Sequence, residues 1–80
     1  MKKPDLNKMG KEQLIRLIEL PNHLRETVLA VIALGEATAT DVAKETGKSR
    51  SSESDHLNEL QRMGYLKRKY STRKVYFALA

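Results

Sequence analysis

The seventeen residues from Gly64 to Ala80 constrain the fold most, because their apolar residues alternate while their charges share one sign. Leu66 on one side of a polar tip is matched by apolar residues at every second position on the other side: Val75, Phe77 and Leu79. Period two is typical of a strand with one buried face. The segment therefore predicts a β-hairpin with its tip at Ser71-Thr72-Arg73.

This hairpin also carries the excess charge of the chain. The 80 residues have a formal net charge of +5, whereas Met1–Met63 balances ten cations against ten acids. The hairpin contributes five cations and no acid: Lys67, Arg68, Lys69, Arg73 and Lys74. Such a segment favours binding to a polyanion. Protection of an edge strand by lysines is the alternative, but inert surfaces usually mix both signs of charge.

Size and composition limit the classes of function. Eighty residues make one small domain with a modest core. The absence of cysteine excludes disulfides, thiol catalysis and thiolate zinc sites. The longest apolar run, Val28–Leu34, is too short to span a bilayer, and the N-terminus does not resemble a signal peptide, so we expect a cytoplasmic protein. His23 and His56 have no convergent ligands, and we expect no metal, cofactor or enzyme activity.

The N-terminal half predicts two helices behind a flexible basic leader, Met1–Asn7. The first helix runs from about Lys8 to Leu20 and ends before Pro21, whose ring cannot continue the hydrogen-bond ladder. Its inward positions are Leu14, Leu17 and Ile18. The second helix, with Asn22 as its cap, is apolar around most of its circumference and should be the central one. Gly35 ends it.

A helix, a glycine turn and a second helix come next. Glu36–Ala37 is expected to form a short strand. Thr38–Asp41 has the pattern of a capping box and begins a short helix that Gly47 ends. Ser49–Met63 is a further helix, capped by its serine, and the glycine after it leads into the hairpin. This order is typical of a helix-turn-helix followed by a wing.

Ala37–Leu79 resembles the winged helix-turn-helix transcriptional regulators of the MarR-like, ArsR-like and archaeal TrmB-like groups. The matching motifs are DVAKETG, SDHLNELQRMGYL and RKVYFAL. The resemblance implies a mainly α fold with a small β-hairpin (α+β), in one domain over residues 1–80, with a leader at 1–7, a helix-turn-helix at 38–63 and a wing at 65–79. It also implies an archaeal regulator whose recognition helix enters the major groove of DNA while the wing contacts the flanking backbone or minor groove.

The predicted DNA-binding residues lie in the recognition helix, in the turn before it and in the wing. They are Lys48, Ser49, Arg50, Ser51, Ser52, Ser54, Asn58, Arg62, Lys67, Arg68, Lys69, Arg73 and Lys74. The helix N-terminus suits a phosphate, Asn58 suits adenine, and Arg62 suits guanine or a phosphate. The alternative stays open that the serines are caps and that Asn58 and Arg62 are ordinary surface side chains. Among the tyrosines, Tyr65 is expected to pack, whereas Tyr70 and Tyr76 either stack on bases or pack.

Two acids depart from the family pattern. Glu53 stands where such regulators have an apolar residue, so it must pair with a cation or turn towards solvent. Asp55 lies on the outward face of a helix whose net charge is minus one. The wing should therefore supply most of the electrostatic affinity. An acidic recognition helix also suits the alternative functions, a protein-interaction module or a low-specificity nucleic-acid binder.

We further expect a homodimer, formed through the N-terminal helices or the hairpin edge. The apolar positions of the first two helices either fill the core or face a twofold partner. A dimer would place two recognition helices about 34 Å apart, one turn of DNA.

Overall fold

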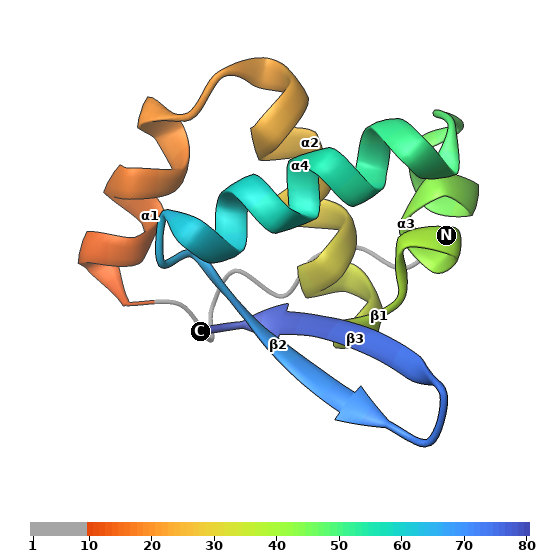
Figure 1. Ribbon diagram of the computed structural model, residues 1–80. Coiled ribbons are helices and arrows are strands. Elements are labelled where there is room, and N and C mark those ends of the chain that lie inside the picture. Colours follow the sequence, from red (N-terminus) through yellow and green to blue (C-terminus); the bar gives the residue numbers. More distant parts are fainter. Residues whose placement is uncertain (1–9) are drawn as a thin grey trace.

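The structure, a computed structural model, describes residues 10–80 and consists of four helices and three strands (Figure 1). These are α1 (Lys11–Glu19), α2 (Asn22–Leu34), β1 (Glu36–Ala37), α3 (Ala39–Thr46), α4 (Arg50–Arg62), β2 (Leu66–Ser71) and β3 (Lys74–Leu79). The predicted fold class, mainly α with a small hairpin in a winged helix-turn-helix, is confirmed. The predicted leader and the predicted helix start at Lys8 lie outside the described residues.

The strands form an antiparallel sheet in the order β1-β3-β2. Ala37 lies opposite Phe77, so the short β1 adds a third strand at the β3 edge of the hairpin. Ser71 pairs with Lys74, and the connection is therefore two residues long, one fewer than predicted. The first of them, Thr72, has a φ of 57°, where L residues with a branched Cβ are rarely found.

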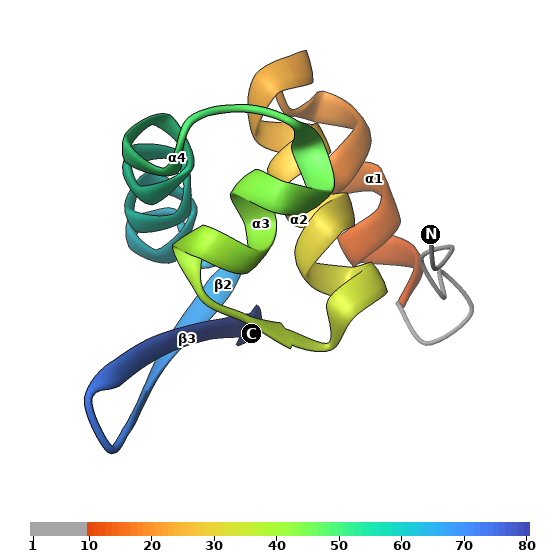
Figure 2. The same cartoon turned by 90° about the vertical axis from the view of Figure 1, so that its right-hand side faces the viewer.

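The core gathers around α2, which contacts α1, α3, α4, β1 and β3. Its Val28 and Val31 are fully buried, as are Leu57 and Leu60 of α4. From the sheet, Phe77 of β3 packs into the same core. As predicted from its apolar circumference, α2 is the central helix, and α4 and the wing lie on one side of it with α1 on the other (Figure 2).

Two predictions about the N-terminal half are wrong. Ile18 is 69 % exposed, because the buried face of α1 is centred on Leu17 and continues into Leu20 after the helix ends. Asn22 does not cap α2; that place is taken by Pro21, whose fixed φ of −57° and missing N–H suit a helix start. Asn22 is instead the first helical residue and accepts a hydrogen bond from Arg25.

The start of the helix-turn-helix forms as its sequence predicts. Thr38 Oγ1 accepts from the Asp41 N–H at 3.1 Å, and Asp41 Oδ2 accepts from the Thr38 N–H at 3.1 Å, which completes the capping box. Gly47 ends α3 at a φ of 78°, a left-handed conformation that suits glycine. Ser49 then caps α4. These local contacts fix where α3 begins and ends and where α4 begins.

Across residues 10–80, none of the helices combines the length and apolar character needed to cross a membrane.

Candidate nucleic-acid interface

The first turn of α4 is exposed and rich in hydroxyl groups. Ser49 Oγ accepts from the Ser52 N–H at 3.2 Å and donates to Ser52 Oγ at 2.8 Å. Ser49 is therefore a cap, which was one of the alternatives left open by the sequence. Arg50 and Ser51 are exposed beside it, and Ser54 is half-buried one turn further along.

Two of the predicted DNA-binding cations already have acidic partners. Lys48 Nζ lies 2.8 Å from Glu26 Oε2, and Lys69 Nζ lies 2.5 Å from Glu36 Oε2. The hydrogen bond to Glu26 raises the pKa of Lys48 above its ordinary value. Both pairs are solvent-exposed, so each contributes little to stability and can be replaced by a phosphate contact.

The other predicted cations differ in their surroundings. Within the described part of the chain, five are exposed and their side chains have no hydrogen bond or ion pair: Arg50, Arg62, Lys67, Arg73 and Lys74. Arg73 lies in the two-residue turn and Lys74 begins β3, so both stand at the far end of the hairpin, which extends beyond the helices (Figure 1). Their charges are available to a ligand at no cost in broken protein contacts.

The register of the hairpin divides the wing cations between two faces of the sheet. Leu66, Arg68 and Tyr70 share the face of the buried Phe77, because side chains of a strand alternate. Lys67, Lys69 and Lys74 lie on the opposite face. The wing is thus basic mainly on the face turned away from the core, and Arg68 alone lies on the helix side, where its guanidinium donates to Asn58 of α4.

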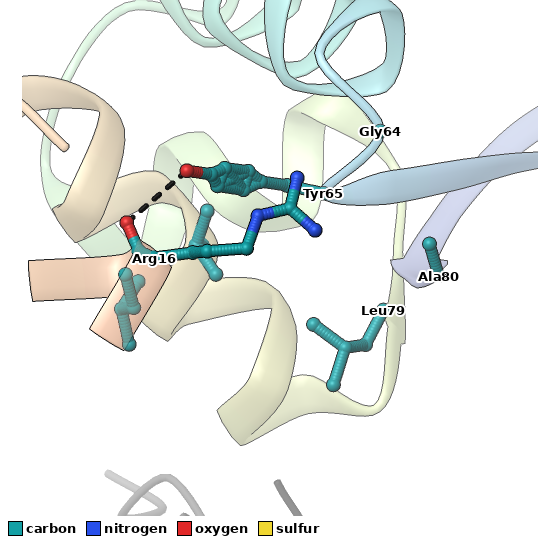
Figure 3. A pocket seen from close by; sticks show the side chains of 7 residues that line it. Arg16, Gly64, Tyr65, Leu79 and Ala80 are labelled. Atoms are coloured by element: carbon teal, nitrogen blue, oxygen red, sulfur yellow. Dashed lines mark hydrogen bonds between the residues drawn. The ribbon is translucent and has the colours of Figure 1, made fainter. Parts of the chain in front are cut away.

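Tyr65 packs, as predicted. The guanidinium carbon of Arg16 lies 4.6 Å from the centre of its ring, and its hydroxyl donates to the Arg16 carbonyl at 3.1 Å (Figure 3). A cavity of about 30 Å³ beside it, also lined by Gly64 and Leu79, has room for about one water. It is too small for an effector molecule. Tyr70 is 73 % exposed on the wing, and Tyr76 is half-buried.

Glu53 is fully buried, so the solvent-facing alternative is wrong. Its carboxylate accepts hydrogen bonds from Thr27 Oγ1 at 2.8 Å, Thr46 Oγ1 at 2.6 Å and His56 Nδ1 at 2.7 Å. Burial by itself raises the pKa of Glu53, but the bonds from Thr46, His56 and Thr27 outweigh it and lower the pKa below its ordinary value. An ionised carboxylate only accepts, so His56 Nδ1 carries the hydrogen.

These four side chains, hereafter the Glu53 cluster, join three helices. Thr27 belongs to α2, Thr46 to α3, and Glu53 with His56 to α4. The ring of His23 lies 5.0 Å from that of His56 and extends the contact along α2. The sequence indicated only that Glu53 departs from the family pattern. It could not indicate its partners, because the two threonines that bind it are far apart in the chain. The cluster therefore fixes how α4 packs against α2 and α3.

Comparison with known proteins identifies the family. Residues 26–80 match the family described as sugar-specific transcriptional regulator TrmB. The chain belongs to the TrmB family. A protein of Archaeoglobus fulgidus is 46 % identical to it over 61 residues, which cover 76 % of this chain and 82 % of that protein. Its source fits the archaeal origin that the resemblance implied.

Solved structures show the same fold. The antimony-specific repressor AntR has a TM-score of 0.69 at 20 % identity, covering 98 % of this chain and 78 % of that one. HlyU of Vibrio cholerae has a TM-score of 0.64 at 22 % identity, covering 90 % and 82 %. The homodimeric winged-helix domain Mb0332 of Mycobacterium bovis has a TM-score of 0.64 at 19 % identity, covering 86 % and 62 %. As a member of the TrmB family of transcriptional regulators, the protein is a DNA-binding regulator of transcription.

Proposed function

We propose that this regulator places α4 in the major groove and the end of its wing on the flanking backbone or in the minor groove. The observation that carries the proposal is the position of Arg73 and Lys74, which are exposed, free of protein partners and set at the end of a projecting hairpin. The same side of the molecule presents α4 (Figure 2). A groove-bound helix with a flanking basic arm uses both features.

The proposed roles follow the charge distribution. Acids on the outward face of α4, Asp55 and Glu59, weaken its attraction to phosphate, so the wing supplies most of the electrostatic affinity. Arg50 and the first-turn serines lie where free backbone N–H groups favour a phosphate. Lys48 and Lys69 exchange their surface carboxylates for phosphates. The residues that bind DNA are those predicted from the sequence, with Ser49 acting through its helix cap, and without Arg68, whose guanidinium is bonded to Asn58 of α4.

A homodimer formed through α1 completes the proposal. Ile15 and Ile18 are 50 % and 69 % exposed on the outer face of this helix. The helix α1 lies on the side of the molecule opposite α4 and the wing, so pairing through α1 leaves both free for DNA (Figure 2). Mb0332, which has the same fold, is homodimeric. We also place the protein in the cytoplasm, with its DNA, and assign it a regulatory rather than an enzymatic role.

The test is a titration of labelled duplex DNA at several salt concentrations, in the presence and absence of random competitor DNA. With about four phosphate contacts per protomer, the logarithm of affinity falls with the logarithm of salt at a slope near −4. Arg73→Ala/Lys74→Ala should reduce that slope by about 2 per protomer and weaken binding about fiftyfold at 0.1 M salt. Arg73→Lys/Lys74→Arg, which keeps both charges, is the matched control and should retain the slope.

Two outcomes would contradict parts of the proposal. A wild type without salt-sensitive binding, even at low salt, would contradict the wing-centred DNA contact and leave the protein-interaction alternative. Equal displacement by random competitor would contradict sequence-specific recognition and favour a low-specificity binder.

A further inference from the structure

Arg68 differs from the other cations of the wing in where its side chain lies. It pairs across the hairpin with Phe77 and shares the face of Leu66, so it is directed towards the helices. Lys67 and Lys69, its neighbours in the chain, lie on the opposite face. Its guanidinium carbon is 5.9 Å from the centre of the Phe77 ring. Arg68 is exposed, but it lies next to α4 and not on the face of the wing that is turned away from the helices.

The guanidinium of Arg68 donates hydrogen bonds to three protein groups. Nη2 donates to Asn58 Oδ1 at 2.9 Å and to Gln61 Oε1 at 3.4 Å, both on α4. Nη1 donates to the Tyr70 hydroxyl at 3.2 Å on its own strand. A planar fork of donors can span such a set, whereas the single ammonium of a lysine cannot. Arg68 therefore links the wing to the recognition helix.

This contact determines what Asn58 offers to a base. Its side-chain oxygen is directed to Arg68, and its NH₂ group has no partner among residues 10–80. The two-bond contact of asparagine with adenine needs that oxygen as an acceptor and the NH₂ as a donor. Because Arg68 holds this oxygen on the side of the wing, Asn58 is left to present its NH₂ hydrogens, which suit the acceptor atoms of guanine, of thymine or of adenine N7.

We propose that Arg68 is a positioning residue for sequence recognition: it holds Asn58 as a hydrogen-bond donor and fixes the wing against α4, and it does not neutralise a phosphate. The inference rests on the proposed placement of α4 in the major groove. It departs from the role that the sequence suggested for Arg68, which was phosphate binding. The two roles differ in a measurable way, because only a phosphate contact contributes to the salt slope.

The experiment selects preferred duplexes from a random library with the wild type, Arg68→Lys, Arg68→Ala, Asn58→Ala and the double variant Asn58→Ala/Arg68→Ala. Affinity for the selected duplex is then measured against salt. Arg68→Lys keeps the charge but cannot span Asn58, Gln61 and Tyr70. Lys67→Ala is the matched control, since Lys67 is the adjacent cation on the other face and has no partner within the described residues.

Asn58→Ala should reduce the preference for one base at one position of the site. Both Arg68 variants should reduce the preference at that same position by at least about fivefold, which is the lower end of the discrimination that one base contact supplies. The double variant should lose no more than Asn58→Ala alone. The salt slope should stay at the wild-type value for both. Lys67→Ala should do the reverse, with a slope reduced by about 0.9 and an unchanged preference. In the free protein, the side-chain NH₂ resonances of Asn58 should shift in Arg68→Lys but not in Lys67→Ala.

Other results would overturn the inference. If Arg68→Lys keeps the wild-type preference and Arg68→Ala lowers the slope by about 0.9, Arg68 is a phosphate contact. Additive losses in the double variant would show that the two residues act separately. A wild type without any sequence preference would overturn the proposed function and this inference together. If a thermal melt shows that Arg68→Ala is not folded, the test uses the base preference of Arg68→Lys and the Asn58 NH₂ resonances in that variant.

Discussion

The Glu53 cluster and the wing each gather charged and polar side chains, but the cluster buries and pairs them whereas the wing leaves most of them exposed. In the cluster a carboxylate with no exposed surface is bonded by two hydroxyls and an imidazole. On the wing, Lys67, Arg73 and Lys74 are exposed and have no partner in the described structure. Charges that hold the fold together are satisfied internally, and charges that serve binding are left for the ligand.

The contrast follows from the cost of desolvation. A buried polar group without a partner destabilises a fold by about 1–3 kcal/mol, and a charged group by more. In the part of the chain that the structure describes, no buried side-chain nitrogen or oxygen lacks a hydrogen-bond partner. An exposed cation has no such cost, because water solvates it until a phosphate takes its place.

The largest expected effect is from Glu53→Ala. It removes the acceptor shared by Thr27, Thr46 and His56 and leaves a void among three helices, so the free energy of unfolding should fall by about 3 kcal/mol. Urea unfolding at pH 7 measures this. Glu59→Ala on the exposed face of α4 and the wing variant Arg73→Ala/Lys74→Ala should each stay within about 0.5 kcal/mol of the wild type. An unchanged unfolding midpoint for Glu53→Ala would remove the distinction between the two regions.

The exposed apolar side chains of α1 test whether an exposed group without a partner marks a binding surface here as it does on the wing. Ile18→Glu places a charge on the outer face of α1 and should raise the dissociation constant of the proposed dimer at least about tenfold, since burial of one isoleucine is worth about 1.5–3 kcal/mol. Sedimentation equilibrium measures the shift. Thr40→Glu adds the same charge at an exposed position of α3 and should leave association unchanged. A wild type that stays monomeric at high concentration would contradict the dimer.

The pKa of Glu53 gives the cluster a pH signature that the wing lacks. A carboxyl whose folded pKa lies below its ordinary value of 4.5 contributes stability above that pH and loses it as pH falls through the folded pKa. The stability of the wild type should therefore decline more steeply below about pH 4.5 than that of Glu53→Gln. Unfolding free energies from pH 7 to pH 3 make the comparison. Both proteins retain His23 and His56, so a parallel decline would contradict the role of Glu53.

Local signals in the sequence predicted most of the fold. Thr38 and Asp41 are three residues apart, and the helix stops at Gly35 and Gly47 depend on single residues, so these elements form where expected. The alternation of Phe77 and its neighbours likewise gave the hairpin. Ile18 was misassigned, because periodicity over nine residues fixes the direction of a buried face only to within one position.

The site was harder to predict, because its contacts join distant residues. Nothing local indicates that Thr27 and Thr46 meet the carboxylate of Glu53, or that Arg68 of the wing meets Asn58 of the helix. Charge alone placed all five wing cations in one class. Alternation along the strand already sends Arg68 and Lys67 to opposite faces, but only the structure shows that Arg68 then reaches Asn58 of α4.

The smallest expected effect concerns the turn of the wing, where the fold accepts local strain. Thr72 has a φ of 57° at the first of two loop positions, where hairpins of this length prefer glycine. Thr72→Gly relieves a backbone cost of about 1–2 kcal/mol and loses part of it again through the greater freedom of glycine in the unfolded chain, for a net stabilisation of about 0.5–1 kcal/mol. Ser71→Gly, the neighbouring substitution within β2, should destabilise slightly instead. A melting temperature that rises for Thr72→Gly and falls for Ser71→Gly would show that the wing, unlike the Glu53 cluster, is not optimised for stability. A fall for both would mean that the threonine side chain stabilises the turn, and the difference between the two regions would then be one of charge alone.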